Sequence, residues 1–324
     1  FIRLLKESAL FALGSILANK LRTMLTLLGI TIGIFSIISV FSVVDALERQ
    51  IRSSIESLGD NVVYIEKWPW QFGGDYQWWR YMNWPSVRPS EMDELLRRSY
   101  AVEHAAFVAS TSRTVEYQNA SAERVRIMGV SADYDKVRLI ELADGRFFTY
   151  PESFAGRMVV ILGADLATNL FRETEPVGKQ IKLMGRNLEV IGVLRRDGSD
   201  SFGMNADNSL LVPLQFLNQF IDVGSDRYNP SILARGRPGI SNEELIDDIT
   251  GAMRGIRRLK PFSDNNFSLN EPSILSQGFD GLFAIISLAG WVIGGFSILV
   301  GGFGIANIMF VSVRERTSII GIQK

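Results

Sequence analysis

The sequence predicts a membrane protein in which two long helices flank an α+β domain outside the membrane. Two runs without any charged residue lead to this prediction, residues 24–44 with 21 residues and residues 281–313 with 33. A bilayer core about 30 Å thick needs roughly 20 apolar residues in a helix, and inside lipid only helices or closed barrels satisfy the backbone. The 236 residues between the runs have the mixed composition of a water-soluble domain.

The first predicted element is an amphipathic helix over residues 1–21, in the cytoplasmic interface of the membrane. Its apolar side chains recur at helical spacing on one face, and small polar side chains occupy another face. The uncharged part is too short to span a bilayer, which is typical of a helix that lies in the membrane surface.

The second element, residues 22–59, is a transmembrane helix that continues into a stalk outside the bilayer. An apolar stripe extends beyond the charge-free run at helical steps, through Leu47, Ile51, Ile55 and Leu58. Gly59 is predicted to cap a helix about 55 Å long at roughly 1.5 Å per residue. The second run is about 12 residues longer than a span requires, so residues 273–313 are likewise predicted to form a stalk and a transmembrane helix.

The domain between the helices is predicted to be mixed α and β, with a β-α-β unit at each end. Residues 60–123 and 228–272 hold these two units, and we expect them to pack together as one split subdomain next to the stalk. Residues 124–227 form an inserted, mostly-β subdomain. Within it, a hairpin is predicted over residues 180–194, turning at residues 185–187.

The short flanks of the two runs predict the orientation in the membrane. Four Lys and Arg residues precede the first run and three follow the second, whereas residues 261–280 contain none. Lys and Arg are retained on the cytoplasmic side. Both termini are therefore predicted to be cytoplasmic and residues 60–272 periplasmic, in a multi-pass protein of the bacterial inner membrane.

Composition and motifs exclude several classes of function. The net charge of −1 and pI near 6.1 do not indicate nucleic acid as a partner. The absence of cysteine excludes thiol chemistry and disulfides, and a domain of about 200 residues is large enough to rely on its core. The motifs GxxxxGK[ST], GxGxxG, GxSxG and HExxH are also absent.

Isolated residues of the types that act in catalysis or metal binding are also interpreted as structural. His104 is the only histidine and precedes a predicted strand. Two acidic pairs, Asp133 with Asp135 and Asp197 with Asp200, lack a full set of ligands and are assigned to turns or caps. Neither span holds an ionisable residue, which argues against an ion relay. We therefore predict no catalytic residue, no cofactor site, no metal site and no enzyme activity.

Small residues follow one face of each predicted span. In lipid, such stripes let two helix backbones approach closely, which predicts helix–helix packing. The alternative is that glycine is simply common in membrane helices. The residues concerned are Gly29, Gly33, Ser36, Gly290, Gly294, Ser297, Gly301 and Gly304.

Residues 67–84, KWPWQFGGDYQWWRYMNW, form an aromatic segment that holds five of the six tryptophans. One interpretation is a loop that binds cargo, a partner or the outer membrane face. The other, which we slightly prefer, is a loop that packs on itself and covers the domain. The tryptophans are Trp68, Trp70, Trp78, Trp79 and Trp84.

Three segments resemble the MacB/FtsX-type ABC transporter permeases. Residues 306–324, ANIMFVSVRERTSIIGIQK, are similar to the end of that family's second span and its cytoplasmic helix, which reads close to ERTxEIGIRKALGA. Residues 18–34 look like the family's first span, and LADGRFF at residues 142–148 resembles a short sequence motif of the domain that the family carries between its first two spans. Ile319 stands where the family has an acidic residue. The matching residues are Glu315, Arg316, Thr317, Ile320, Gly321 and Ile322.

The resemblance implies a MacB-like permease, with a porter-like split subdomain around a sabre-like insert. A separate or fused ATPase that binds ATP and Mg would grip the coupling helix starting at Arg314, and a second permease copy would complete a homodimer or heterodimer. ATP-driven motion would then reach the periplasmic domain, a mechanism termed mechanotransmission, to export a drug, peptide or lipoprotein-like cargo. A periplasmic adaptor and an outer-membrane channel are further implied partners.

The resemblance also implies third and fourth spans beyond residue 324, so we expect this chain, which opens on Phe1, to be a fragment. Two alternatives stay open. A two-span sensor with a ligand-binding periplasmic domain would continue into a signalling module instead of two more spans. An FtsX-like regulator of cell-wall hydrolases would co-purify with a hydrolase instead of an adaptor.

Overall fold

A computed structural model describes residues 20–56, 61–71, 76–138, 140–172, 174–196 and 206–322. In the two long helices, most side chains before residue 31 and after residue 304 lie outside the described part. The chain divides into two compact units. One is the domain Gln50–Gly278, and the other consists of Phe1–Arg49 with Phe279–Lys324.

The two long helices are α2 (Lys20–Glu56) and α10 (Pro272–Ile322), with 37 and 51 residues. Each is long and apolar enough to cross a membrane, over Thr31–Ile55 and Pro272–Gly304. Helix α10 continues without interruption beyond the predicted end of the span at residue 313. The predicted amphipathic helix 1–21 lies almost wholly outside the described residues, and so does the predicted cap Gly59.

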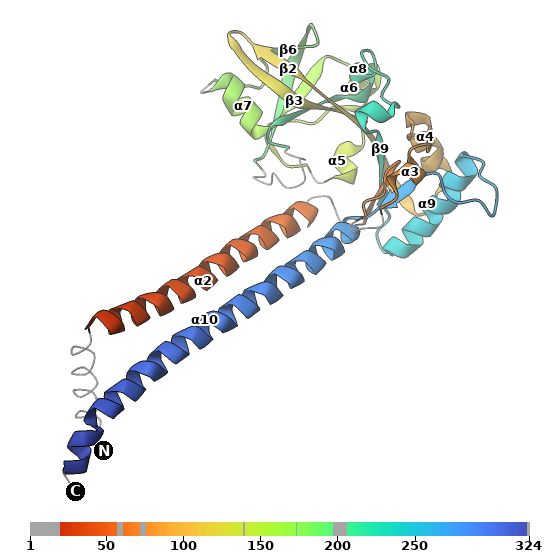
Figure 1. The fold of residues 1–324 in the computed structure, drawn as a ribbon. Helices are drawn as coiled ribbons and strands as arrows, with labels where there is room; N and C mark the ends of the chain where they lie inside the picture. The colour runs from red at the N-terminus through yellow and green to blue at the C-terminus, as the bar shows by residue number, and fades with distance from the viewer. Residues whose placement is uncertain are drawn as a thin grey trace. The chain divides into compact units, whose positions relative to one another are not determined.

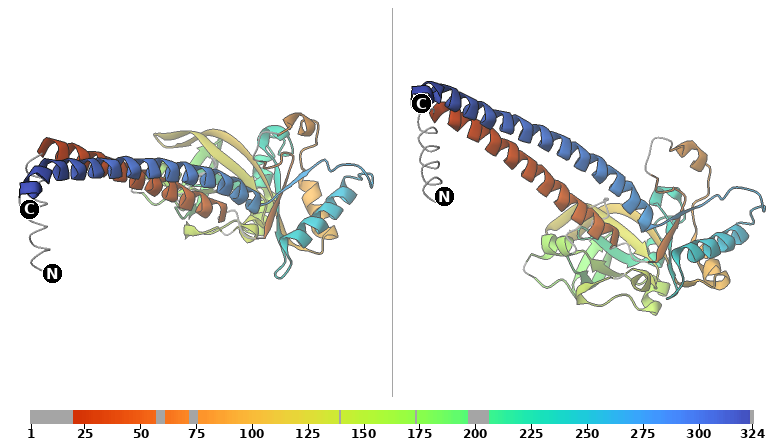
Figure 2. Two further views of the ribbon diagram at one scale, coloured as in Figure 1. Left: turned by 60° about the horizontal axis from the view of Figure 1, so that its bottom comes forward. Right: turned by 90° about the horizontal axis from the view of Figure 1, so that it is seen from below.

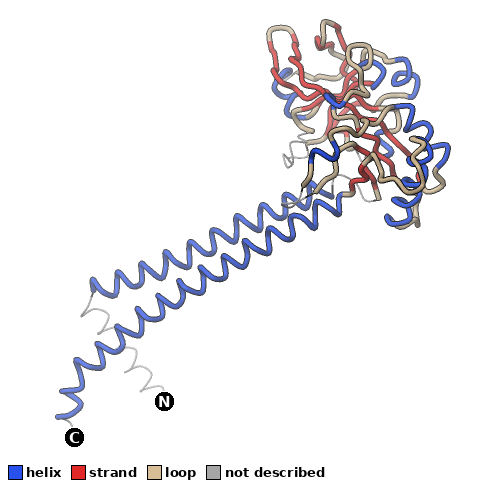
Figure 3. Tube along the Cα trace, turned by 45° about the vertical axis from the view of Figure 1, so that its right-hand side comes forward, coloured by secondary structure: helices blue, strands red, loops and turns tan. Residues whose placement is uncertain are grey.

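The domain Gln50–Gly278 is built on one mixed sheet with the order β10-β1-β9-β2-β3-β8-β5-β7-β4, while β6 pairs with β2 and β7. Figures 1 and 3 show these strands at the centre of the domain, with short helices around them. The strands are β1 (Val62–Glu66), β2 (Val102–Tyr117), β3 (Ala120–Val130), β4 (Leu142–Gly145), β5 (Val159–Leu162), β6 (Gln180–Leu183), β7 (Arg186–Leu194), β8 (Ser209–Pro213), β9 (Ser231–Gly236) and β10 (Ser268–Asn270).

Strand β2 is the longest element of the sheet. Along one edge it pairs antiparallel with β3, and along the other it pairs first with β9 and then with β6. The sheet is thus continuous between the predicted segments 60–123 and 124–227, and their division into subdomains stays a prediction. The remaining helices are α3 (Trp78–Tyr81), α4 (Pro89–Arg98), α5 (Tyr134–Val137), α6 (Tyr150–Ala155), α7 (Ala164–Phe171), α8 (Leu214–Leu217), η2 (Asp226–Tyr228) and α9 (Asn242–Ile256).

Helices α4 and α9 pack against each other beside the sheet, where α4 contacts β2 and α9 contacts β1. Amphipathic faces bury Leu95 of α4 and Leu245 of α9 in the common core. A buried ion pair joins the two helices, because Arg257 Nε donates to Glu91 Oε1 at 2.8 Å. The strand–helix–strand order therefore occurs at both ends of the domain, as β1-α4-β2 and β9-α9-β10.

Two local predictions were wrong in detail. His104 lies inside β2, because that strand begins at Val102 and not at residue 105. The hairpin between β6 and β7 turns at Met184 and Gly185, both with positive φ, and not at residues 185–187. Two successive positive φ angles match the right-handed twist of a two-residue hairpin. The periodicity also missed β4 and α6, which are only four and six residues long.

Candidate functional site

The contact between α2 and α10 involves four of the eight predicted packing residues. A methyl group placed on Gly33 would lie 3.4 Å from Ser297 Cβ, and one on Gly290 would lie 2.7 Å from Phe41 Cζ. Gly294 faces Ile37 at 3.5 Å by the same measure. Residue numbers rise along one helix as they fall along the other, so the helices run antiparallel and side by side (Figure 2).

The other four packing residues take no part in a described contact of this kind. Gly301 and Gly304 are half-buried on α10, whereas the surroundings of Gly29 and Ser36 lie outside the described part. The predicted coupling residues, 314–322, fall in the last turns of α10, and their side chains also lie outside the described residues. Their role therefore rests on sequence.

The aromatic segment has an anchored base. The Trp70 indole N–H donates to Glu66 Oε2 at 3.0 Å, and the Trp70 backbone N–H donates to Asn270 Oδ1 at 2.9 Å. The Asn270 amide donates in turn to the Trp68 carbonyl and to Glu66 Oε2. Since Asn270 belongs to β10, this network ties the segment to the far end of the domain sequence.

The surroundings of Trp70 also change the pKa of the Glu66 carboxyl. Burial raises the pKa of the Glu66 carboxyl, and the hydrogen bonds from Asn270 and Trp70 oppose that rise. Neighbouring Tyr64 packs its ring 5.0 Å from the Trp70 ring, and burial raises its pKa as well. Glu66, Trp70 and Asn270 thus form a hydrogen-bonded cluster, and the Tyr64 ring packs against it.

The aromatic segment also has an exposed tip. Trp78 and Trp79 of α3 are 49% and 57% exposed, and their rings meet edge to face at 6.0 Å. The Tyr81 and Trp84 rings also meet edge to face, with their centroids 4.8 Å apart. Trp68, Trp70 and Trp84 are half-buried, whereas Trp78 and Trp79 are exposed, and both interpretations of the segment stay predictions.

The phrase LADGRFF has a defined geometry. Gly145 has φ +81°, and a methyl group there would lie 2.2 Å from the Ile191 carbonyl oxygen, so the backbones of β4 and β7 meet closely. Arg146 forms a two-bonded pair with Glu152, both at 2.7 Å. That guanidinium is the main cause that lowers the pKa of Glu152 to about 2. The phrase is therefore a structural corner that joins β4 to α6.

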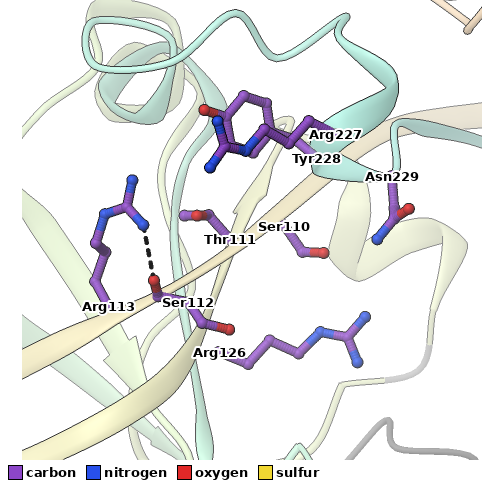
Figure 4. A pocket seen from close by; sticks show the side chains of 8 residues that line it. All are labelled: Ser110, Thr111, Ser112, Arg113, Arg126, Arg227, Tyr228 and Asn229. Carbon is purple, nitrogen blue, oxygen red and sulfur yellow. Dashed lines mark hydrogen bonds between the residues drawn. The ribbon is translucent and has the colours of Figure 1, made fainter.

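An arginine pocket lies where β2, β3 and η2 meet, and the sequence patterns missed it. Its volume is about 500 Å³, and none of its lining residues is acidic. Figure 4 shows the guanidinium groups of three arginines around it. The lining residues, which define the arginine pocket below, are Ser110, Thr111, Ser112, Arg113, Arg126, Arg227, Tyr228 and Asn229.

Of the residues considered as metal ligands, only Asp133, Asp135 and His104 belong to the described part of the chain. Asp133 pairs with Lys136 at 2.8 Å, and His104 is half-buried within β2. Asp197 and Asp200 lie outside the described residues. Within the described ranges, no group of three or more His, Asp and Glu side chains could hold a metal ion.

Comparison with known proteins gives consistent matches. A family described as MacB-like periplasmic core domain matches residues 23–252. Over 99% of its length the chain is 30% identical to "Uncharacterized ABC transporter permease YknZ" of Bacillus subtilis, of which it covers 77%. Over 98% of its length it is 28% identical to "Macrolide export ATP-binding/permease protein MacB" of Neisseria meningitidis, of which it covers 47%.

A solved structure shows the same fold. The periplasmic region of MacB from Actinobacillus actinomycetemcomitans aligns with a TM-score of 0.56 at 19% identity, and the match covers 71% of this chain and 97% of that one. The chain thus spans about three quarters of the length of one curated relative and about half of the other.

Proposed function

Because the chain belongs to the family of MacB-like ABC transporter permeases, we propose that it is the permease subunit of an exporter. It transmits ATP-driven motion from a cytoplasmic ATPase to its periplasmic domain, which moves a drug, peptide or lipoprotein-like cargo. ATP and Mg belong to the ATPase, whether separate or fused, and this chain carries out no catalysis itself. A second permease copy, a periplasmic adaptor, an outer-membrane channel and membrane lipid complete the proposed partners.

The continuity of α10 is the observation that supports this proposal most. The helix begins two residues after β10 ends and runs through the apolar segment to the residues that resemble the family's coupling helix. All hydrogen bonds of an α-helix lie within the element, so a displacement at one end reaches the other. The charge-free runs 24–44 and 281–313 contain no ionisable residue that could form an ion pathway, which favours a mechanical role, that of a lever, over an ion-conducting one.

The coupling role of residues 314–322 can be tested by substitution. We expect Ile320→Glu with Gly321→Glu to leave ATP hydrolysis in place but to disconnect it from the periplasmic domain, because two charges replace an apolar docking surface. The readout is the distance between spin labels on two permease copies, attached at Ser121→Cys in this cysteine-free chain. Wild-type copies should change this distance on ATP binding, and the double variant should not.

Ser318→Glu is the matched control, since it adds one charge beside the motif residues without replacing any of them. If the double variant changes its distance as the wild type does, residues 320 and 321 have no coupling role. If wild-type copies show no ATP-dependent change at all, the lever proposal fails. Co-purification with a cell-wall hydrolase, and with no cargo, would instead favour the FtsX-like alternative.

We also propose that the exposed tip of the aromatic segment contacts cargo or a partner protein. Exposed tryptophans contribute large contact areas at interfaces, and Trp78 and Trp79 are not needed to anchor the segment. We expect Trp78→Ala with Trp79→Ala to reduce co-purifying cargo or adaptor by roughly fivefold or more, which corresponds to the loss of about 1 kcal/mol of contact energy, while the melting temperature stays unchanged.

Phe262→Ala provides the control for general surface hydrophobicity, because Phe262 is fully exposed in another loop. Equal co-purification with both variants would show that the tip has no binding role. The segment would then only cover the domain.

A further inference from the structure

The sheet has a gap along one edge of β2. Strand β9 pairs with β2 only as far as the Val108–Ser231 position, and β6 joins the same edge at the Val115–Leu183 position. Between these points, residues 109–114 have no strand partner on that edge among the described residues. Six residues at roughly 3.3 Å each leave an open edge about 20 Å long.

The start of β9 explains the gap. Continuing the β9 register by two residues would place Asn229 opposite Ser110. Asn229 instead has φ +46° and follows the short helix η2, so the chain turns away from β2 at this point. Lys67 holds η2 in place through its ion pair with Asp226 at 2.7 Å. The gap is therefore a built feature of the described fold.

The backbone groups of β2 that face the gap can be identified. The Phe107 N–H donates to Ser131 Oγ at 3.0 Å, and the Phe107 carbonyl accepts from the Ser131 N–H at 3.1 Å, so Phe107 faces β3. Antiparallel strands alternate the side to which their backbone groups point. The N–H and C=O groups of Ser110 and Ser112 consequently point into the gap. The Ser112 carbonyl agrees, since it accepts from Arg113 Nη1 at 2.9 Å.

The gap coincides with the arginine pocket, which both serines line. The guanidinium groups of Arg113 and Arg227 lie on one side of the pocket, Arg126 extends away from them (Figure 4), and no lining residue is acidic. Arginine binds carboxylates through two parallel hydrogen bonds. The volume of about 500 Å³ lies within the range of known ligand pockets, about 300 to 1,000 Å³.

We propose that this gap binds an extended acidic peptide segment, which adds as a short strand to β2 and pairs its carboxylates with Arg113 and Arg227. Strand addition supplies main-chain hydrogen bonds, and the side-chain pockets supply specificity. Both requirements are met within the described part of the chain, since the edge has no strand partner there and exposes two N–H groups, and two arginines lie beside it. The site is separate from the coupling helix, so it goes beyond the export proposal.

The test measures binding of a fluorescent hexapeptide of alternating valine and glutamate to the full chain in phosphatidylcholine nanodiscs. Fluorescence anisotropy should show saturable binding that weakens at high salt. Arg113→Gln and Arg227→Gln should each weaken binding by about tenfold, as expected for the loss of a charge-assisted pair. Arg157→Gln, which changes an exposed arginine outside the pocket, should leave binding unchanged. The same peptide with glutamine in place of glutamate should not bind.

A second experiment tests the main-chain hydrogen bonds between the peptide and β2. The peptide N-methylated at alternate residues cannot donate to β2 and should lose binding. Ser112→Pro removes an N–H that faces the gap without removing a bond to β3, so it should weaken binding while the melting temperature is kept. Equal binding of the methylated peptide, or displacement of the hexapeptide by millimolar inorganic phosphate, would show a small-anion site and overturn the proposal.

Absence of saturable binding, or binding that ignores both arginine substitutions, would also overturn it. None of these results bears on the ATP-driven distance change between permease copies. Failure of this inference and failure of the export proposal are therefore distinguishable.

Discussion

At the scale of single residues, the corner formed by LADGRFF combines three physical demands. Gly145 is needed because its positive φ and the nearby Ile191 carbonyl leave no room for a side chain. Phe148 is buried in the domain. Arg146 binds both oxygens of Glu152, and the same carboxylate accepts the Thr149 N–H at 2.9 Å to cap α6. Gly145, Arg146 and Phe148 thus each have a structural reason.

The Arg146–Glu152 pair predicts a pH dependence of stability. The pKa of Glu152 is lowered from 4.5 to about 2 in the folded protein. A carboxyl with a lowered folded pKa stabilises the protein fully above its unfolded pKa, and this stability is lost as pH falls through the folded value. We expect a loss of about 1 kcal/mol between pH 4.5 and pH 2, reduced from the full effect because Arg146 is half exposed.

The measurement is the denaturant midpoint of the domain, followed by tryptophan fluorescence at each pH. Glu152→Gln should be less stable than wild type near neutral pH and should lack this part of the pH dependence. An unchanged pH profile in Glu152→Gln would show that the pair contributes nothing to folding.

At the scale of elements, the packing of α2 against α10 depends on small side chains at the points of contact. Gly290 accommodates the Phe41 ring, and Phe41 also meets Trp291 edge to face at 6.4 Å. Glycine on the opposite side of the helix has no such role, since a methyl group on Gly295 would meet nothing within 4 Å. Small residues on α10 therefore matter for packing only on the side that contacts α2.

A pair of introduced cysteines tests this helix contact. Disulfides need Cβ atoms about 3.5 to 4.5 Å apart, and a Cβ on Gly33 would lie 3.4 Å from that of Ser297. We expect Gly33→Cys with Ser297→Cys to form a disulfide on mild oxidation, detected by mass spectrometry after digestion. Gly33→Cys with Gly295→Cys is the control and should stay reduced. Equal cross-linking of both pairs would refute the antiparallel register.

At the scale of the whole molecule, the proposed mechanism depends on which side of the membrane each unit occupies. The domain Gln50–Gly278 and the residues that follow the second apolar segment must lie on opposite sides if motion is to pass between them. The chain offers a clean background for a labelling test, since it contains no cysteine.

The labelling test uses an impermeant maleimide on intact spheroplasts. Ser121→Cys, exposed at the start of β3, should react before lysis. Arg314→Cys should react only after lysis, because the flanking positive charges retain that end in the cytoplasm. Labelling of Ser121→Cys only after lysis would place the domain in the cytosol, and the lever mechanism and the export proposal would fail together.

The sequence by itself determined the features that depend on local composition. A span is recognisable because the membrane demands a long run of apolar residues in one helix, and the motif around residues 314–322 can be compared letter by letter. The strand–helix–strand order at both ends of the domain was also predicted, since the period of burial along each segment reveals its type.

Only the tertiary structure decided which distant residues meet. Trp70 is anchored by Asn270, 200 positions away, whereas Trp79, nine positions away from Trp70, is exposed. Arg113, Arg126 and Arg227 surround one pocket because strand pairing and the turn at Asn229 bring three separate segments together. No local pattern encodes such contacts, since they arise from the register of the sheet and from burial that the whole chain must satisfy at once.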